Sequence, residues 1–288
     1  MEQDNVYKVI AEKMPKMSKS QEKIADYILQ HQNTVPFLTV AKLAKEAGVS
    51  EATVVRFAVF LGYAGFPDLQ QHLQNSVQQQ LTTIERLKMS SEVYKTDDQA
   101  AYDIFQDDIA NIKSTMENLD LKSLKNAAAY LLNGERIYIC ANRSAAALGN
   151  FLHYYLNLLL DHAEMANTKE MLPEQIYQLS EKDVVVGISF SRYTTSTINM
   201  VAFAKEQGAK TIVITDTLYS PLIPHADVIL LASSQLPAFF DSFVGPLSLI
   251  NSLIAYIGRE RMDDAQERLK KLEDVWERFE VFHKKDNK

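Results

Sequence analysis

The residues best suited to chemistry lie in a loop rich in hydroxyl groups. This loop, 189–197, reads SFSRYTTST and enters a helix expected to run to about Gln207. The start of a helix offers unpaired N–H groups and the positive end of the helix dipole, and hydroxyl groups add further donors. A second loop, 140–144, also enters an expected helix, and there Arg143 and Ser144 can both donate to an anion. Together the two loops predict an anion-binding site.

Helix capping is the alternative use of these hydroxyl groups. Ser and Thr are common N-cap residues, so one hydroxyl at a helix start has no functional meaning by itself. The two loops carry seven Ser or Thr residues and two arginines, which favours an anion site over capping alone. The residues expected to bind the ligand are Asn142, Arg143, Ser144, Ser189, Ser191, Arg192 and Thr194.

Five short apolar segments, separated by helical stretches, predict the sheet that positions these loops. The expected strands are 136–140, 162–166, 184–190, 211–216 and 228–233. Alternation of strands and helices is typical of an α/β fold with a five-stranded parallel sheet covered on both faces. Ligands of such sheets bind beyond the carboxyl ends of the strands. The two loops should therefore lie side by side at that edge.

The N-terminal third predicts an all-α domain that contains a helix-turn-helix. Thr39 is expected to cap a short helix, VAKLAKEA, and Ser50 a second one, EATVVRFAVFLG. Gly48 stands where the first helix should end in a left-handed residue, and Ala44 is small where the two helices would touch. The apolar residues expected to be buried are Val49, Val54 and Phe57. These agreements together indicate helix-turn-helix spacing.

The start of the second helix is the part that such a motif places in the major groove. Its outward residues, which we expect to contact DNA, are Ser50, Glu51, Ala52, Thr53 and Arg56. Arg56 could pair bidentately with guanine. The alternative is an ordinary helical hairpin, because residues 1–76 hold eight Lys or Arg and eight Asp or Glu and a neutral domain attracts phosphates weakly. Useful affinity for DNA would then require a dimer.

Composition excludes several other classes of protein. The chain of 288 residues has only nine glycines, none in a GxGxxG or GxxxxGK[ST] arrangement, so a Rossmann dinucleotide site or a P-loop is not expected. The single cysteine, Cys140, suits a reducing compartment. The richest apolar run, 151–160, is too short to span a membrane. We expect a cytoplasmic protein with no metal site and no cofactor.

Two segments carry a resemblance to a known family. Residues 17–73, which include VSEATVVRFAVFLGYAGF at 49–66, resemble the N-terminal helix-turn-helix domain of RpiR-family bacterial transcriptional regulators. Residues 133–258 resemble the SIS (sugar isomerase) domain that follows in that family, most clearly in GISFSRYTTSTINMVAFAKEQGAKTIVITD. The resemblance implies a regulator whose SIS domain binds a phosphorylated sugar and thereby changes the affinity of a dimer or tetramer for operator DNA.

Site residues also follow from the resemblance. The resemblance implies that the contacts to the phosphate and the sugar come from Ser144, Ser189, Ser191 and Thr194. The family usually has glycine where this chain has Cys140, Asn142 and Arg192. Asn142 can still take a left-handed conformation. Arg192 would either contact a phosphate itself or fill space that the ligand uses, in which case the domain recognises something else.

Two other functions remain open on the sequence. A sugar-phosphate isomerase needs a general base, and the candidates are His162, Glu164 and Glu170, although a helix-turn-helix has no use in such an enzyme. A structural assembly protein is the other alternative, because Leu269, Leu272, Trp276 and Phe279 lie near heptad spacing for under two heptads. The segment 239–243, FFDSF, could be an interface, a loop over a ligand, or an entry to the core.

The expected domain order follows from these patterns. Residues 1–80 form the helix-turn-helix domain, in which one helix begins at Ser18 with Gln21 at capping-box spacing. A helical connector, taken as 81–120 and beginning in pattern near Asp68, leads to a SIS-type domain at 121–262. A C-terminal helix occupies 263–288.

Overall fold

The computed structural model describes residues 6–32, 34–78, 82–94, 99–166, 176–236 and 238–283. The chain divides into two compact units, one made of 1–108 with 235–241 and the other of 109–234 with 242–288. Each unit has its own apolar core. The helix-turn-helix pattern falls in the first unit and the strand pattern in the second.

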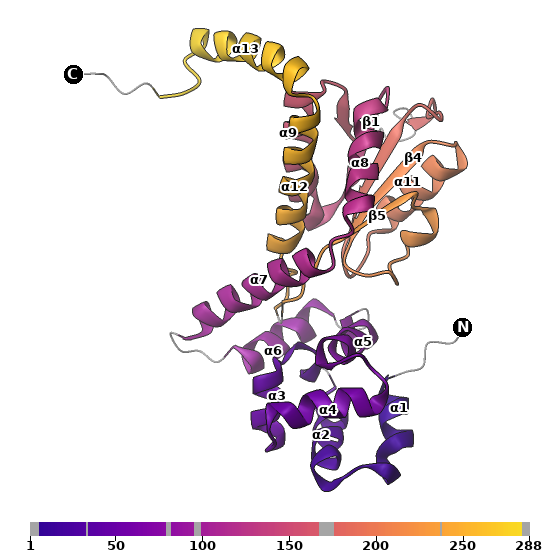
Figure 1. The fold of residues 1–288 in the computed structure, drawn as a ribbon, viewed down its shortest axis with the longest axis vertical. Coiled ribbons are helices and arrows are strands. Elements are labelled where there is room, and N and C mark those ends of the chain that lie inside the picture. The colour runs from indigo at the N-terminus through magenta and orange to yellow at the C-terminus, as the bar shows by residue number, and fades with distance from the viewer. Residues whose placement is uncertain are drawn as a thin grey trace, which may run out of the picture. The chain divides into compact units, whose positions relative to one another are not determined.

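The first unit is helical, as the sequence predicts (Figure 1). Its helices are α1 (Val6–Lys13), α2 (Lys19–Gln30), α3 (Val40–Ala47), α4 (Glu51–Leu61), α5 (Phe66–Gln78) and α6 (Thr83–Val93), with short 3₁₀ turns at Met14–Lys16 and Val35–Phe37. Helix α7 (Gln99–Glu117) continues into the second unit. The expected helical connector is broken into α5, α6 and α7, and α5 buries Leu69 and Leu73 in the core of the first unit.

The segment 235–241 belongs to the first unit although it lies between elements of the second in the chain. Arg86 of α6 is almost fully buried and pairs with Asp241 at 2.7 Å. Its guanidinium also donates to the carbonyl oxygens of Ala238 and Phe240. A buried arginine needs several acceptors, so these contacts fix the segment within this unit.

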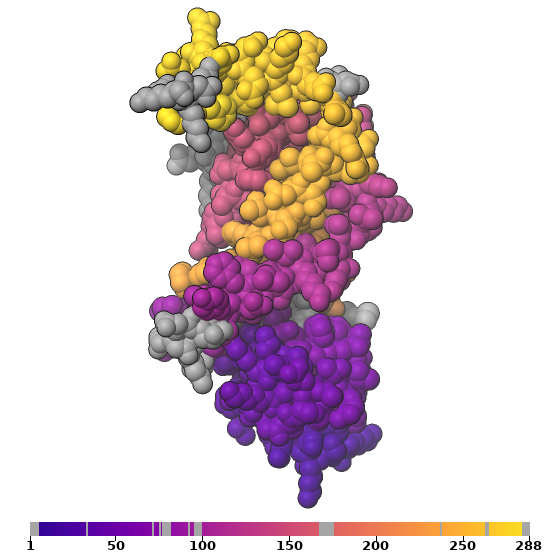
Figure 2. Space-filling model, turned by 60° about the vertical axis from the view of Figure 1, so that its left-hand side comes forward, coloured from indigo at the N-terminus to yellow at the C-terminus, as the bar shows by residue number. Residues whose placement is uncertain are grey.

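The second unit contains a five-stranded parallel sheet, which confirms the α/β prediction. The strands β1 (Ile137–Ala141), β2 (Ala163–Met165), β3 (Val184–Ile188), β4 (Lys210–Thr215) and β5 (Val228–Leu231) lie in the order β2-β1-β3-β4-β5. Helices α8 (Leu121–Asn133), α9 (Ala146–Leu159) and α12 (Val244–Glu260) cover one face, and α11 (Thr195–Glu206) covers the other. Figures 1 and 2 show α9 and α12 side by side.

The amino edge of the sheet is held by ion pairs. Asp183, before β3, accepts two hydrogen bonds from Arg136, each 2.8 Å long. Lys205 of α11 pairs with Asp227, before β5. Burial tends to raise the pKa of both aspartates, but these cations and nearby Ser180 and Thr211 donors outweigh it, so each pKa is lowered. The groups that start the strands are therefore mutually satisfied.

The C-terminal helix α13 (Met262–Arg278) packs against α9 and α12. Within the described residues, no single helix has the length and apolar content to cross a membrane; the bent pair Glu51–Leu61 and Phe66–Gln74 meets the test by length and composition only.

Candidate functional site

The helix-turn-helix has the local geometry that the sequence predicts. Thr39 Oγ1 accepts from Lys42 N and caps α3, and Ser50 Oγ accepts from Thr53 N and caps α4. Gly48 has φ +64° at the end of α3, where a Cβ would meet nothing within 4 Å but would strain the backbone. Val54 and Phe57 are fully buried beneath the turn, and Val49 is partly buried.

The exposed face of α4 contains the residues expected to contact DNA. Ser50, Glu51, Ala52 and Arg56 are exposed and Thr53 is partly exposed. Arg56 Nη2 donates to Thr53 Oγ1 at 3.3 Å, and that oxygen also lies 2.8 Å from Ser50 Oγ. The three polar side chains thus form one hydrogen-bonded row along the first turns of the helix.

Two exposed valines extend this face, and the sequence argument missed them. Val55 and Val59 are 43% and 56% exposed and follow Ala52 at three- and seven-residue spacing. Apolar side chains at such positions can contact thymine methyl groups. The signal was available in the sequence, because neither valine falls on the buried face with Val54 and Phe57.

The two hydroxyl-rich loops meet at the carboxyl edge of the sheet. β1 and β3 are hydrogen-bonded neighbours with Cys140 level with Gly187. Asn142 Nδ2, from loop 140–144, donates to Thr197 Oγ1 at 3.0 Å, at the start of α11. The expected juxtaposition of the loops is therefore present.

Glycines allow α9 and α11, the helices that follow the two loops, to pack closely on the strands of the sheet. A Cβ on Gly149 of α9 would lie 2.6 Å from the Ala141 side chain, and one on Gly187 of β3 would lie 2.4 Å from Val201 of α11. Contacts this short cannot be accommodated unless the neighbouring atoms shift. These two glycines therefore set the positions of the helix starts that carry the loops.

Helix capping does not account for the hydroxyls of these loops. No side chain caps α9 or α11: Thr194 occupies the N-cap position of α11 without making that bond. Ser189 Oγ instead accepts from Thr194 N, which shapes the loop. Ser191 Oγ is buried and has no hydrogen-bond partner among the described residues. A buried hydroxyl without a partner is costly, and a ligand would satisfy it.

The two loops contain arginines in left-handed conformations. Arg143 has φ +57° and Arg192 has φ +62°. Asn142, which could have taken the left-handed conformation, is extended (φ −118°), and the left-handed residue is the next one, Arg143. Arg192 is exposed, so its side chain does not bury itself in the loop. Strained backbone of this kind clusters at functional sites, although Asp161 and Glu280, outside these loops, also have positive φ.

Asp216 is the site residue that the sequence argument missed. It follows β4 and accepts from Ser191 N at 3.2 Å and from the Tyr193 hydroxyl at 2.7 Å. Burial, with the nearby Asp216 charge, raises the pKa of Tyr193 above its usual range, so the phenol stays a proton donor. The sequence signal was its place at the carboxyl end of a strand, but only the fold brings it to loop 189–197.

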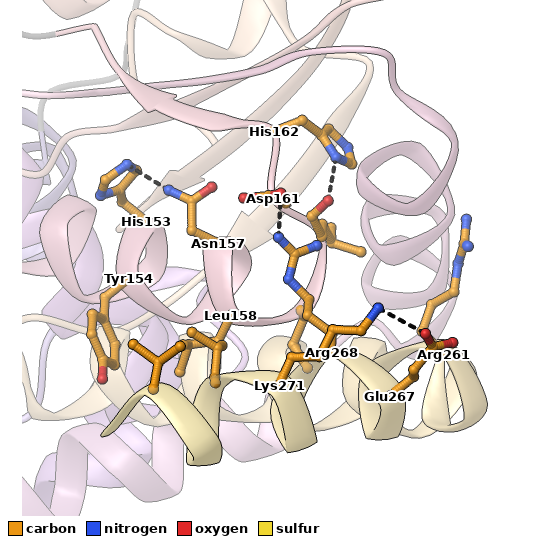
Figure 3. Close-up of a pocket in the computed structure, with 14 residues that line it drawn as sticks. His153, Tyr154, Asn157, Leu158, Asp161, His162, Arg261, Glu267, Arg268 and Lys271 are labelled. Carbon is orange, nitrogen blue, oxygen red and sulfur yellow. Dashed lines mark hydrogen bonds and ion pairs between the residues drawn. The ribbon is translucent and has the colours of Figure 1, made fainter. Parts of the chain in front are cut away.

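The candidates for a general base are not gathered at this site. His162 precedes β2, level with the start of β1, which is the amino edge of the sheet. Glu164 is exposed, and Glu170 lies outside the described residues. His162 instead lines a groove of about 780 Å³ between α9 and α13, where its Nδ1 contacts the Leu160 carbonyl and Arg268 pairs with Asp161 (Figure 3).

Cys140 packs as a small buried side chain. The side chain is fully buried, and burial raises the pKa of its thiol to about 11. A thiol with so high a pKa is a poor nucleophile at neutral pH. Among the described residues, no group of three or more His, Cys, Asp or Glu could hold a metal ion.

Comparison with known proteins defines the class. A family model for the "Helix-turn-helix domain, rpiR family" matches residues 4–80, and one for the SIS domain matches 130–256. The chain is therefore a two-domain transcriptional regulator with helix-turn-helix and SIS domains. More particularly, it belongs to the RpiR family, which confirms the resemblance seen in the sequence.

Relatives and solved structures agree with this assignment. An HTH-type transcriptional regulator of Haemophilus influenzae is 28% identical over 80% of this chain and 81% of its own. The regulator HexR of Pseudomonas aeruginosa is 26% identical over 73% of each chain. The sugar isomerase domain of an RpiR transcription factor from Sphaerobacter thermophilus matches 61% of this chain and 99% of that one, with TM-score 0.59 and 25% identity.

One further solved structure shares the fold along nearly the whole chain. The Vibrio vulnificus NanR protein, solved in complex with ManNAc-6P, covers 97% of this chain and 100% of its own, with TM-score 0.60 and 21% identity. This likeness extends the shared fold over both units.

Proposed function

We propose that this regulator binds operator DNA through α4 and that a phosphorylated sugar, bound at the carboxyl edge of the sheet, changes its affinity for DNA. The observation that carries the ligand site is Ser191 Oγ, which is buried without a partner among the described residues. The sugar phosphate held by NanR, which shares this fold, supports the ligand class.

The donors around Ser191 suit a phosphorylated ligand. The uncapped first turn of α11 leaves N–H groups for an anion. The 3₁₀ turn Arg143–Ala145, which leads into α9, also has no side-chain cap. Arg143 and Ser144 are exposed beside the start of α9, and Arg192 is exposed in loop 189–197. The Asp216 carboxylate would repel a phosphate but can accept from a sugar hydroxyl. We therefore place the phosphate toward the helix starts and the hydroxyls toward Asp216.

The DNA surface combines polar and apolar contacts. Arg56 is proposed to contact a guanine, with Ser50 and Thr53 reaching a base edge or a phosphate, while Val55 and Val59 lie against thymine methyl groups. Glu51 and Ala52 complete the surface. Because the first 76 residues carry equal numbers of acidic and basic groups, phosphate contacts are few. We propose that a two-fold dimer, or a dimer of dimers, reads an inverted repeat.

A chain of hydrogen bonds leads from the ligand site to α7. Asp216 follows Thr215, whose carbonyl accepts from Ala232 N. The next residue, Ser233, donates through its N–H to Thr115 Oγ1 and through its hydroxyl to Asn111 Oδ1, both on α7. Helix α7 then continues into the DNA-binding unit. A ligand that moves Asp216 would thus act on the helix that joins the two units.

Calorimetry with a panel of phosphorylated sugars tests the ligand site. Wild type is expected to bind at least one sugar phosphate, and Ser191→Ala to bind it about tenfold more weakly, the loss expected for one hydrogen bond. Ser252→Ala, which removes an exposed hydroxyl on α12 that bonds Ser248 O, is the matched control. Absence of binding to every sugar phosphate, or equal binding by Ser191→Ala, would contradict the assignment.

A further inference from the structure

Helix α7 has an apolar face that nothing in the described structure covers. Its large apolar residues are exposed at heptad spacing: Tyr102 (65%), Phe105 (67%), Ile109 (55%), Ile112 (37%) and Met116 (66%). Spacings of three and four residues place all five on one side of the helix. In Figure 2 the magenta atoms of this segment lie at the surface. Neither family model covers residues 81–129.

The other side of α7 already makes the contacts that hold the helix within its own chain. Ala100 and Ile104 pack on the core of the first unit, and Asp103 pairs with Lys42 at 3.1 Å. Further along, Asn111 and Thr115 are buried and contact Ser233. The heptad stripe is therefore not the face that α7 uses to pack on its own chain.

The charges beside the stripe indicate what covers it. With the stripe as positions a and d, Asp108 occupies a g position and Lys113 the following e position. In a parallel pair of helices, g of one helix meets the next e of the other. Two copies of α7 aligned in parallel would thus place Asp108 beside Lys113 twice, whereas an antiparallel pair would bring like charges together.

We propose that α7 is a dimerisation helix, and that its stripe packs in parallel against the same stripe of a second copy of this chain. Residues of the a and d type on such a pair interlock and exclude water. Lys113 lies 4.0 Å from Glu117 of its own helix, and its side chain, 70% exposed, is able to reach across to the second copy. The pairing would join two DNA-binding units through the helix that also leads to the ligand site. It does not depend on which ligand that site binds.

Analytical sedimentation of the full chain tests whether the apolar stripe of α7 is the dimer interface. Wild type is expected to be at least a dimer at micromolar concentration, and Ile109→Glu to raise the dissociation constant by about 100-fold or more, because a charge would be buried in the seam. Val275→Glu on α13, where the valine is 48% exposed, is the matched control and should associate like wild type. A monomeric wild type, or an Ile109→Glu that associates like wild type, would overturn the proposal.

Disulfide cross-linking tests the parallel orientation with a milder change. Met116→Cys should form a dimer under mild oxidation, because equivalent positions lie within disulfide distance only in a parallel pair. The one natural cysteine, Cys140, is buried, so the background is low. Val275→Cys should not cross-link. Reversal of Asp108 or Lys113 alone should weaken the dimer, and Asp108→Lys with Lys113→Asp should restore it. Lack of a Met116→Cys dimer, or lack of restoration, would overturn the parallel pairing.

Discussion

The helix-turn-helix and the sheet-edge loops use the same residue types in opposite ways. In the first, Thr39 and Ser50 cap helices, and the left-handed position is a glycine, Gly48. In the second, Ser191 caps nothing, and left-handed positions are taken by Arg143 and Arg192. Where Ser and Thr cap helices and glycine takes the left-handed position, the residues stabilise the fold. Where a serine caps nothing and arginine takes the left-handed position, ligand binding is the expected reason.

The largest effect is expected at the DNA-reading face. Arg56→Ala should cost about 1–3 kcal/mol of binding free energy per half-site, and a symmetric dimer would lose it twice. Thermal stability and sugar-phosphate affinity should not change, because Arg56 is exposed and bonds only Thr53 among the contacts described. Shift assays on the cognate operator, with Arg278→Ala as control, measure the loss. Retention of both affinity and sequence preference would refute the role of Arg56.

The left-handed positions should respond in opposite directions to substitution. Gly48→Ala should lower the free energy of unfolding by about 1–2 kcal/mol, because Cβ disfavours that backbone. Arg192→Gly relieves the same backbone strain in the folded state. Glycine also gives the unfolded chain more conformational entropy, which offsets part of that gain, so the free energy of unfolding should rise by about 0–1 kcal/mol. Sugar-phosphate affinity should fall at the same time. Urea unfolding and calorimetry on each variant separate the two effects. An Arg192→Gly variant that is less stable than wild type and binds the sugar phosphate with wild-type affinity would contradict the proposed difference between Gly48 and Arg192.

Removing the hydroxyls of Thr39 and Ser191 should also affect stability in different ways, but by smaller amounts. Thr39→Ala removes a helix cap and should cost about 1 kcal/mol of stability. Ser191→Ala removes a buried hydroxyl without a partner, so the stability of the ligand-free protein should stay the same or rise. Chemical denaturation of both variants without ligand is the measurement. Equal destabilisation would mean that Ser191 is a structural residue.

The smallest effect concerns acid stability. The folded pKa of Asp183 lies below its ordinary value, so the charged form is stabilised by folding. This contribution is present above the unfolded pKa, about 3.9, and is lost as the pH falls through the folded pKa. Stability should therefore decline below about pH 4, and less steeply in Asp183→Asn. An equally steep decline in that variant would place the acid sensitivity elsewhere.

Local chemistry explains which parts of the structure the sequence could predict. The caps Thr39 and Ser50, the turn at Gly48 and the five strands depend on neighbours in the chain, and all are confirmed. Asp216 could not be found this way, because its partners Ser191 and Tyr193 lie on a different strand end.

Elements set by tertiary packing were also missed or misplaced. Helix α1 precedes the first helix expected from the pattern, and the connector divides into three helices. The left-handed residue of loop 140–144 is Arg143 rather than Asn142. The heptad pattern of the α7 stripe does not stand out in the sequence, because the buried face of the helix mixes polar and apolar residues.

The most direct test of the central proposal is a titration of labelled operator DNA with wild-type protein, with and without a sugar phosphate that binds. Ligand coupled to DNA binding should change the operator dissociation constant by about 5- to 150-fold, and DNA should change the ligand affinity by the same factor. Ser191→Ala should retain operator binding but respond only at higher ligand concentration. An operator affinity that stays the same at saturating sugar phosphate would contradict the account.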